Sequence, residues 1–182
     1  MAARRSVLLG GLSLGGLSLG GLSLGGCGFR PLYAPAAGGR PGPAAAQMAA
    51  IYVPVFAERA GQLLRQALQQ RFEGAGTGTA KAYELLATIT IAGEGIGIQR
   101  DSSTTRVRLT GTAPWTLRVL SLDHGVLAQG TSRVLDGYNV INQQFFAAEL
   151  ENDAAQRRVV ETLADQITLQ VAGYFLNRAA PA

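Results

Sequence analysis

The feature that most constrains this chain is the position of Cys27, the only cysteine among 182 residues. Before it, Arg4 and Arg5 are followed by an uncharged run over 7–26 that consists almost entirely of Leu, Gly and Ser. A basic start, an apolar centre and small residues at the end are typical of a bacterial export signal. We therefore expect residues 1–26 to be removed, and the remainder to fold outside the cytoplasm without a disulfide.

A transmembrane helix is the alternative for the same run, because about 20 apolar residues can span a bilayer. Glycine, the poorest ordinary helix former, occupies eight of the 20 positions from 7 to 26, and no cluster of positive charge follows the run. These features favour a cleaved signal over a permanent span.

The end of this run, Leu24-Gly25-Gly26-Cys27, resembles the lipobox of bacterial lipoproteins, with Leu at −3 and small residues before the cut. The resemblance implies cleavage between Gly26 and Cys27, and a diacylglycerol and an N-acyl chain on Cys27, with no other cofactor. Several acyl chains anchor durably, whereas one myristoyl chain binds only marginally. Gly28 in place of Asp at position +2 implies the periplasmic face of the outer membrane.

The charge and composition after Cys27 are those of an ordinary single domain. Loss of Arg4 and Arg5 leaves 14 basic residues against 12 acidic ones, so the net charge falls from +4 to about +2. This small excess gives no reason to expect a nucleic-acid partner. Fifteen of the 16 basic residues are Arg, whose planar guanidinium suits phosphate groups.

The first half of the mature chain predicts a tether followed by a strand, a helix and a strand. Residues 27–50 are the lipidated N-terminus and an Ala/Gly/Pro-rich tether with little to bury. Residues 51–56 predict a short strand, placed at an edge by Pro54, and a parallel crossover joins it to a strand at 83–91. Glycines at 93–97 predict a bulged strand end, because no helix start follows them as a phosphate loop requires. The intervening helix, 58–72, has one apolar face: Ala60, Leu64, Ala67, Leu68 and Phe72.

The second half predicts a long hairpin and a long helix. Residues 104–122 alternate, and Pro114 within them predicts an edge or a bulge. Residues 123–125 are a turn, 126–138 return as a strand, and 147–177 form a helix. The strand points one set of side chains inward (Val107, Leu109, Gly111, Ala113) and another outward (Arg106, Arg108, Thr110, Thr112), and the helix carries an apolar stripe (Leu150, Ala154, Val160, Leu163, Ile167, Val171, Tyr174).

The predicted fold is therefore α+β, a two-layer sandwich with two helices on one face of a four-stranded mixed sheet, in the order β-α-β-β-β-α. The domain covers 51–178, and 179–182 form a tail. Solvent or a partner should cover the other face of the sheet.

Catalytic and metal chemistry have few candidates. His124 is the only histidine, and its neighbours Ser121 and Asp123 lie in the same tight turn, where they cannot converge on one reacting atom. No set of residues has the spacing of metal ligands. We expect no enzymatic activity. Arg100, Arg106 and Arg108 form the candidate anion-binding patch, and an ordinary solvated face is the alternative.

Two stretches resemble the LptE family of lipopolysaccharide-assembly lipoproteins. The first is Cys27-Gly28-Phe29-Arg30-Pro31-Leu32-Tyr33. The second runs from Tyr138-Asn139 through 145–147 and 151–155 to Arg157 and Arg158. The resemblance implies a non-enzymatic plug and assembly factor of the LptD β-barrel that also binds lipopolysaccharide.

On this resemblance, Arg100, Arg106 and Arg108 are the candidate lipopolysaccharide contacts, and Phe29, Leu32 and Tyr33 are candidate partner contacts. Arg forks suit the phosphates of lipid A, and an Arg- and Thr-lined sheet face suits a polar barrel lumen. Two other roles stay open: an auxiliary lipoprotein of an ABC-type phospholipid transport system, and a periplasmic lipoprotein hydrolase.

Overall fold

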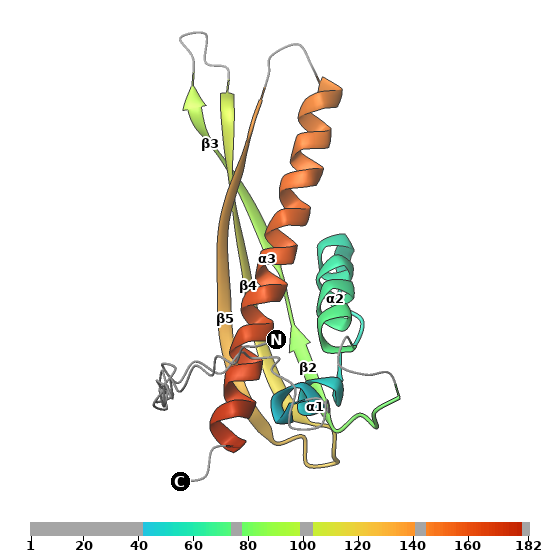
Figure 1. Cartoon of the computed structure of the whole chain (residues 1–182). Coiled ribbons are helices and arrows are strands. Elements are labelled where there is room, and N and C mark those ends of the chain that lie inside the picture. The colour runs from blue at the N-terminus through green and yellow to red at the C-terminus, as the bar shows by residue number, and fades with distance from the viewer. Residues whose placement is uncertain (1–41, 74–77, 99–103, 141–144, 180–182) are drawn as a thin grey trace, which may run out of the picture. The chain divides into compact units, whose positions relative to one another are not determined.

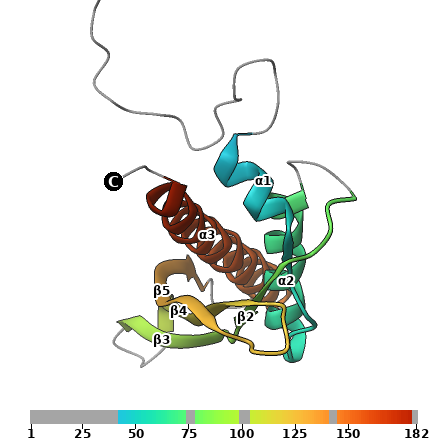
Figure 2. The ribbon, with the colours of Figure 1, turned by 90° about the horizontal axis from the view of Figure 1, so that it is seen from below.

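The computed structural model describes residues 42–73, 78–98, 104–140 and 145–179, in which one sheet is covered on one face by helices (Figures 1 and 2). This confirms the predicted α+β two-layer architecture. The elements in order are α1 (Pro43–Ala49), β1 (Ile51–Tyr52), α2 (Glu58–Glu73), β2 (Tyr83–Ala87), β3 (Thr90–Ile98), β4 (Thr104–Val119), β5 (Val126–Asn139) and α3 (Phe145–Ala179).

Strand β4 is the central strand of the sheet. Strand β5 pairs with one edge of it, antiparallel, from Arg106 to Arg118. The other edge is shared by β3, along 104–112, and β2, along 115–119. Strand β1 lies parallel to β2, which confirms the predicted parallel pairing. The glycines of 93–97 lie in β3, where the register shifts on both sides of Gly97, so the predicted bulge is confirmed.

Pro114 lies where β2 and β3 meet along β4. It is in the central strand and causes no register shift with β5, so the prediction of an edge or bulge was wrong. Its carbonyl accepts a hydrogen bond from the Thr88 N–H at 3.1 Å, and it has no N–H to offer on that side. The missing donor therefore coincides with a break in the neighbouring strand. The predicted strand 83–91 is divided there, which gives five strands instead of four.

The core lies between α3 and the inner face of β4 and β5. The predicted inward residues of β4 from 109 to 113 are buried, as are Trp115 and Leu117. Leu150 and Ala154 were wrongly predicted to be part of the buried stripe of α3, because both are exposed. Leu150 lies five residues before the buried Ala155, which turns it about 140° around the helix. Val160, Leu163, Ile167 and Val171 are buried as predicted, and Tyr174 is half-buried; the buried stripe also includes Ala155, Val159 and Phe175.

Helix α1 replaces the last part of the predicted tether. Ala44, Met48 and Ala49 are buried, and α1 contacts both α2 and α3. Pro43 at the first turn and a run of alanines favour a helix, and their small side chains allow close packing. The tether prediction was therefore wrong for 43–49. Residues 27–41, the signal over 1–26 and the tail from 180 lie outside the described residues.

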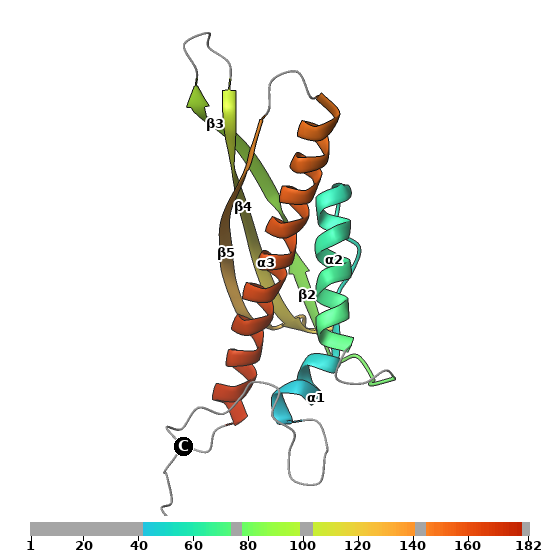
Figure 3. The same cartoon turned by 45° about the horizontal axis from the view of Figure 1, so that its top comes forward.

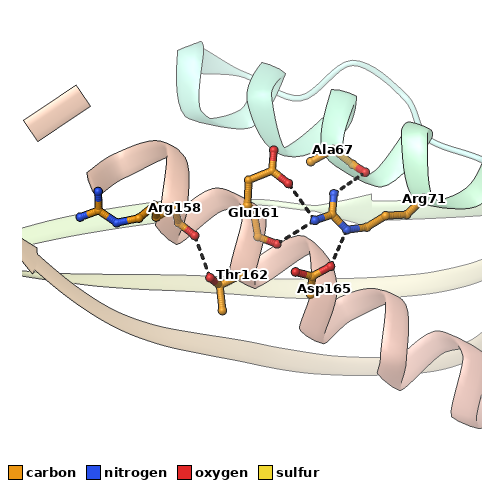
Figure 4. A network of polar contacts seen from close by, with 6 residues as sticks. All are labelled: Ala67, Arg71, Arg158, Glu161, Thr162 and Asp165. Atoms are coloured by element: carbon orange, nitrogen blue, oxygen red, sulfur yellow. Dashed lines mark hydrogen bonds and ion pairs between the residues drawn. The ribbon is translucent and has the colours of Figure 1, made fainter. Parts of the chain in front are cut away.

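Helices α2 and α3 run side by side and are joined by a clamp on Arg71 (Figures 3 and 4). Its Nε donates to Asp165 and its Nη2 to Glu161, both at 2.7 Å, while its Nη1 donates to the Ala67 carbonyl at 2.9 Å. Burial lowers the pKa of Arg71, but the hydrogen bonds that it donates to Asp165 and Glu161 outweigh burial and raise that pKa above its ordinary value. The clamp fixes α2 against the helix that covers the core.

Candidate functional site

The sheet face turned away from the helices carries the predicted arginine patch. Arg106 and Arg108 are two residues apart on β4, so their side chains lie on the same face, and both are exposed. Cross-strand partners share a face, which adds Leu135 and Gly137 of β5 and Glu94 of β3. We call this surface the open face. It lacks any covering element among the residues that the structure describes.

A hollow of about 280 Å³ lies on the open face, lined by Ile96, Arg106, Arg108, Leu135, Asp136 and Gly137. Gly137 pairs with Arg108 across the strands, and its missing side chain leaves room there. A Cβ at this position would lie 2.8 Å from the Val107 carbonyl oxygen, so a larger residue would push the two strands apart. The glycine therefore keeps the strands paired beneath an open depression.

The lining of the hollow is amphipathic. Ile96 is 45% exposed and Leu135 is 63% exposed, and they lie beside two guanidinium groups. Large aliphatic side chains are costly to leave in water, and guanidinium groups bind phosphates and carboxylates through paired hydrogen bonds. A ligand with an anionic head and acyl chains fits this combination.

The two arginines differ in their counter-charges. Arg108 Nη2 forms an ion pair with Glu94 at 2.6 Å, in which both side chains are largely exposed. Arg106 has no acidic partner within ion-pair distance among the described residues. Among the described residues, Arg106 therefore brings to the hollow a positive charge that no ion pair offsets.

Asp136 lines the same hollow, but its charge is directed to α3. Its carboxylate accepts hydrogen bonds from Arg158 Nε at 2.8 Å and from the Gly137 N–H at 2.7 Å. Burial raises the pKa of Asp136, but these hydrogen bonds outweigh it and hold that pKa below its ordinary value. The hydrogen bond to Asp136 in turn raises the pKa of Arg158. Arg158 of α3 therefore neutralises the charge of Asp136, which forms no ion pair with Arg106 or Arg108.

A second hollow, of about 530 Å³, opens at the edge of the sheet where β2 ends. It lies between the segment 54–57, the end of β2 and residues 114–116 of β4, and its lining is mainly apolar. Val55 on its rim is 74% exposed. This hollow has room for an acyl chain but has no charged group in its lining.

The other predicted positions do not form a site in the described residues. Ser121, Asp123 and His124 lie in an exposed turn in which the His124 N–H donates to the Ser121 carbonyl at 3.0 Å. No group of three His, Cys, Asp or Glu side chains suited to a metal occurs in the described ranges. None of the described helices is both long and apolar enough to cross a bilayer. The remaining predicted positions, Gly26, Cys27, Phe29, Leu32, Tyr33 and Arg100, lie outside the described residues.

The family model for lipopolysaccharide-assembly proteins, LptE, matches residues 48–171, which include all five strands and most of the helical layer. The chain belongs to the LptE family. Solved structures share the fold of this LptE domain. A candidate lipoprotein from Caulobacter crescentus is 22% identical with a TM-score of 0.61, covering 76% of this chain and 98% of its own.

Rare lipoprotein B from Shewanella oneidensis is 12% identical, with a TM-score of 0.54, covering 71% of this chain and 97% of its own. Lipoprotein B from Nitrosomonas europaea is 12% identical, with a TM-score of 0.52, covering 72% of this chain and 88% of its own. A comparison with curated protein sequences gives no significant match. Family membership assigns this LptE chain a role in lipopolysaccharide assembly.

The sequence predicted the arginines of the LptE open face but missed the apolar half of the hollow. Leu135 was the available signal, because it occupies an outward position of an alternating strand that polar residues should fill. Ile96 follows a glycine bulge, so its direction could not be predicted from alternation. Gly137 leaves room for the hollow only because the strand register places it opposite Arg108, and the sequence alone does not give that register.

Proposed function

We propose that this LptE chain is an outer-membrane lipoprotein that binds lipopolysaccharide through the hollow of the open face and serves as plug and assembly factor of the LptD β-barrel. Diacylglycerol and an N-acyl chain on Cys27 would hold it on the periplasmic side of the membrane. The observation that carries the proposal is the pairing of Arg106 and Arg108 with two exposed aliphatic side chains in one hollow.

Lipid A has chemical groups that suit both the charged and the aliphatic side chains of this lining. Its phosphates accept bidentate hydrogen bonds from guanidinium groups, and its acyl chains remove Ile96 and Leu135 from water. Each hydrogen bond to a charged group contributes about 1.5–3 kcal/mol, so losing one changes the affinity at least tenfold. Solvent exposure of the site and salt reduce this value.

The test is binding of lipopolysaccharide by the mature protein with Arg106→Glu and Arg108→Glu together. We expect binding at least about tenfold weaker, because the hollow then repels phosphate. Arg157→Glu with Arg178→Glu is the matched control, since it changes the net charge equally at exposed positions of α3. Unchanged binding by a folded Arg106/Arg108 double variant would contradict the proposal, as would equal loss in both double variants.

The plug role is supported by the polarity of the open face. Its central strand β4 carries Thr110 and Thr112 at alternate positions after the arginines, and the lumen of an outer-membrane barrel is polar as well. Co-purification from detergent-solubilised outer membranes tests this part. A large β-barrel partner supports the plug role, and an inner-membrane transporter supports the phospholipid-transport alternative. Recovery with neither partner would contradict both assignments.

Mass spectrometry of the native protein tests the anchor. We expect a chain that begins at Cys27 and carries fatty acid on its sulfur and its amine. A chain that keeps residues 1–26 and lacks acyl groups would contradict the proposed localisation.

A further inference from the structure

The tip of the hairpin between β4 and β5 exposes three aliphatic side chains within seven residues. Leu120 is 41% exposed, Val126 is 62% exposed and Leu122 is fully exposed at the turn. The turn itself is closed by the backbone hydrogen bond from His124 to Ser121. Apolar groups concentrated at a projecting tip, away from the core, are typical of a contact surface.

This hairpin tip lies at the end of the domain where the chain from Cys27 enters. The Leu120 N–H donates to the Ala82 carbonyl at 2.8 Å, and the Ala82 N–H donates to the Ala50 carbonyl at 2.9 Å. Ala50 is the C-cap residue that follows α1, so two hydrogen bonds connect the hairpin through Ala82 to the end of that helix. Figures 1 and 3 show the hairpin turn, α1 and the end of α3 at the same end of the domain.

The length of chain before α1 keeps this end within reach of a membrane. Gly42 lies 15 positions after Cys27 in the sequence, and even a fully extended chain covers only about 50 Å over that length. The charges at this end do not oppose contact with phospholipid. Lys81 and Arg178 are exposed there, against one acidic side chain at the tip, Asp123.

We infer that the tip of the β4–β5 hairpin rests in the lipid surface to which Cys27 holds the domain. Leu122 enters the outer acyl region, and Leu120 and Val126 lie at the level of the headgroups. Aliphatic side chains gain most by leaving water, and a shallow insertion of this kind adds to the affinity of a lipid anchor. This inference rests on the proposed lipidation of Cys27. The polar open face is the surface suited to a barrel lumen, whereas the hairpin tip is apolar.

The test uses the mature, lipidated chain in vesicles of phosphatidylethanolamine and phosphatidylglycerol with brominated acyl chains, which quench tryptophan on contact. Leu122→Trp places a probe at the tip without disturbing packing, because the side chain is fully exposed. The native Trp115 is only 5% exposed in the core and supplies the background. Leu150→Trp is the matched control, because Leu150 is 72% exposed near the start of α3, at the end of the domain away from the hairpin tip.

We expect the emission of the Leu122→Trp probe to fall by roughly half in brominated vesicles, with a blue shift, and that of the Leu150→Trp probe to be unchanged. A chain that floats with the vesicles while the indole at position 122 stays unquenched would overturn the inference and leave the anchor intact. A chain that does not float with them would overturn the anchor and the inference together. Equal quenching of the probes at positions 122 and 150 would also overturn it, as would photocrosslinking of position 122 to a β-barrel protein without quenching.

Discussion

Replacing Arg71 with Met should weaken the attachment of α2 to α3 without unfolding the sheet. Arg71 is the residue of α2 that reaches two carboxylates on α3, those of Glu161 and Asp165 (Figure 4). Its side chain is only 18% exposed, so the guanidinium is largely removed from water. Methionine keeps the apolar stem in place and removes the charge and all of its hydrogen bonds.

The cost follows from how much of each partner stays in water. A hydrogen bond to a charged group contributes about 1.5–3 kcal/mol when it is shielded, and an exposed ion pair only about 0–1 kcal/mol. Glu161 and Asp165 are 57% and 62% exposed, so both recover water when Arg71 is lost. We therefore expect the free energy of unfolding to fall by about 2 kcal/mol, which lowers the Tm by about 4–8 °C.

Urea denaturation of the mature protein measures this change, with Arg59→Met as the matched control. Arg59 also joins α2 to α3, through Asp153 at 3.2 Å, but its side chain is 69% exposed. That variant should lose no more than about 0.5 kcal/mol. If Arg71→Met shifts the midpoint no further than Arg59→Met does, the distinction between a shielded clamp and a surface pair is refuted for this domain.

Four further substitutions test the packing and the electrostatics. Gly111→Val should lower the free energy of unfolding by at least about 1–3 kcal/mol, because any Cβ there meets the Val159 side chain of α3. Gly173→Ala, with open space around it, should raise that free energy by about 0.5–1 kcal/mol. Thermal unfolding compares the two variants. Met48 is only 1% exposed, so Met48→Ala should lower the free energy of unfolding by about 2 kcal/mol or more in the same assay; this tests whether α1 belongs to the core. The lowered pKa of Asp136 stabilises the fold above about pH 4, and that contribution is lost as the pH falls through the lowered value. Asp136→Asn should therefore be less stable than the native chain at pH 7, with the gap closing at acidic pH in denaturation curves.

The sequence predicted correctly those strands and helices in which the periodicity of apolar residues identifies the buried face. Alternation in 104–119 identified the two faces of β4, and the spacing of Leu64, Leu68 and Phe72 identified the buried face of α2. Helix α1 escaped prediction because Ala and Pro are common in linkers, and its burial depends on the surface that α2 and α3 provide. The break between β2 and β3 depends on Pro114, which is distant in sequence.

The candidate site was predictable only in its charged half, for a related reason. A charged side chain is recognisable from one strand, because alternation places Arg106 and Arg108 on the face away from the core. A hollow is a property of several strands in register, and it requires Gly137 opposite Arg108 and Leu135 beside it. Register is fixed by the whole sheet and its turns, so local pattern could not supply it.

Binding and folding can be separated in this domain because the sheet is antiparallel around β4 and has one solvated face. The apolar groups that stabilise it lie under α3, while the open face contributes pairs such as Arg108 with Glu94, in which the side chains are 47% and 67% exposed. Such a pair is worth less than about 1 kcal/mol, so an anionic ligand that displaces Glu94 from Arg108 loses little in exchange. Glu94 can therefore neutralise Arg108 when no ligand is bound. A phosphate can displace it, because a phosphate offers more acceptor oxygens to the same guanidinium.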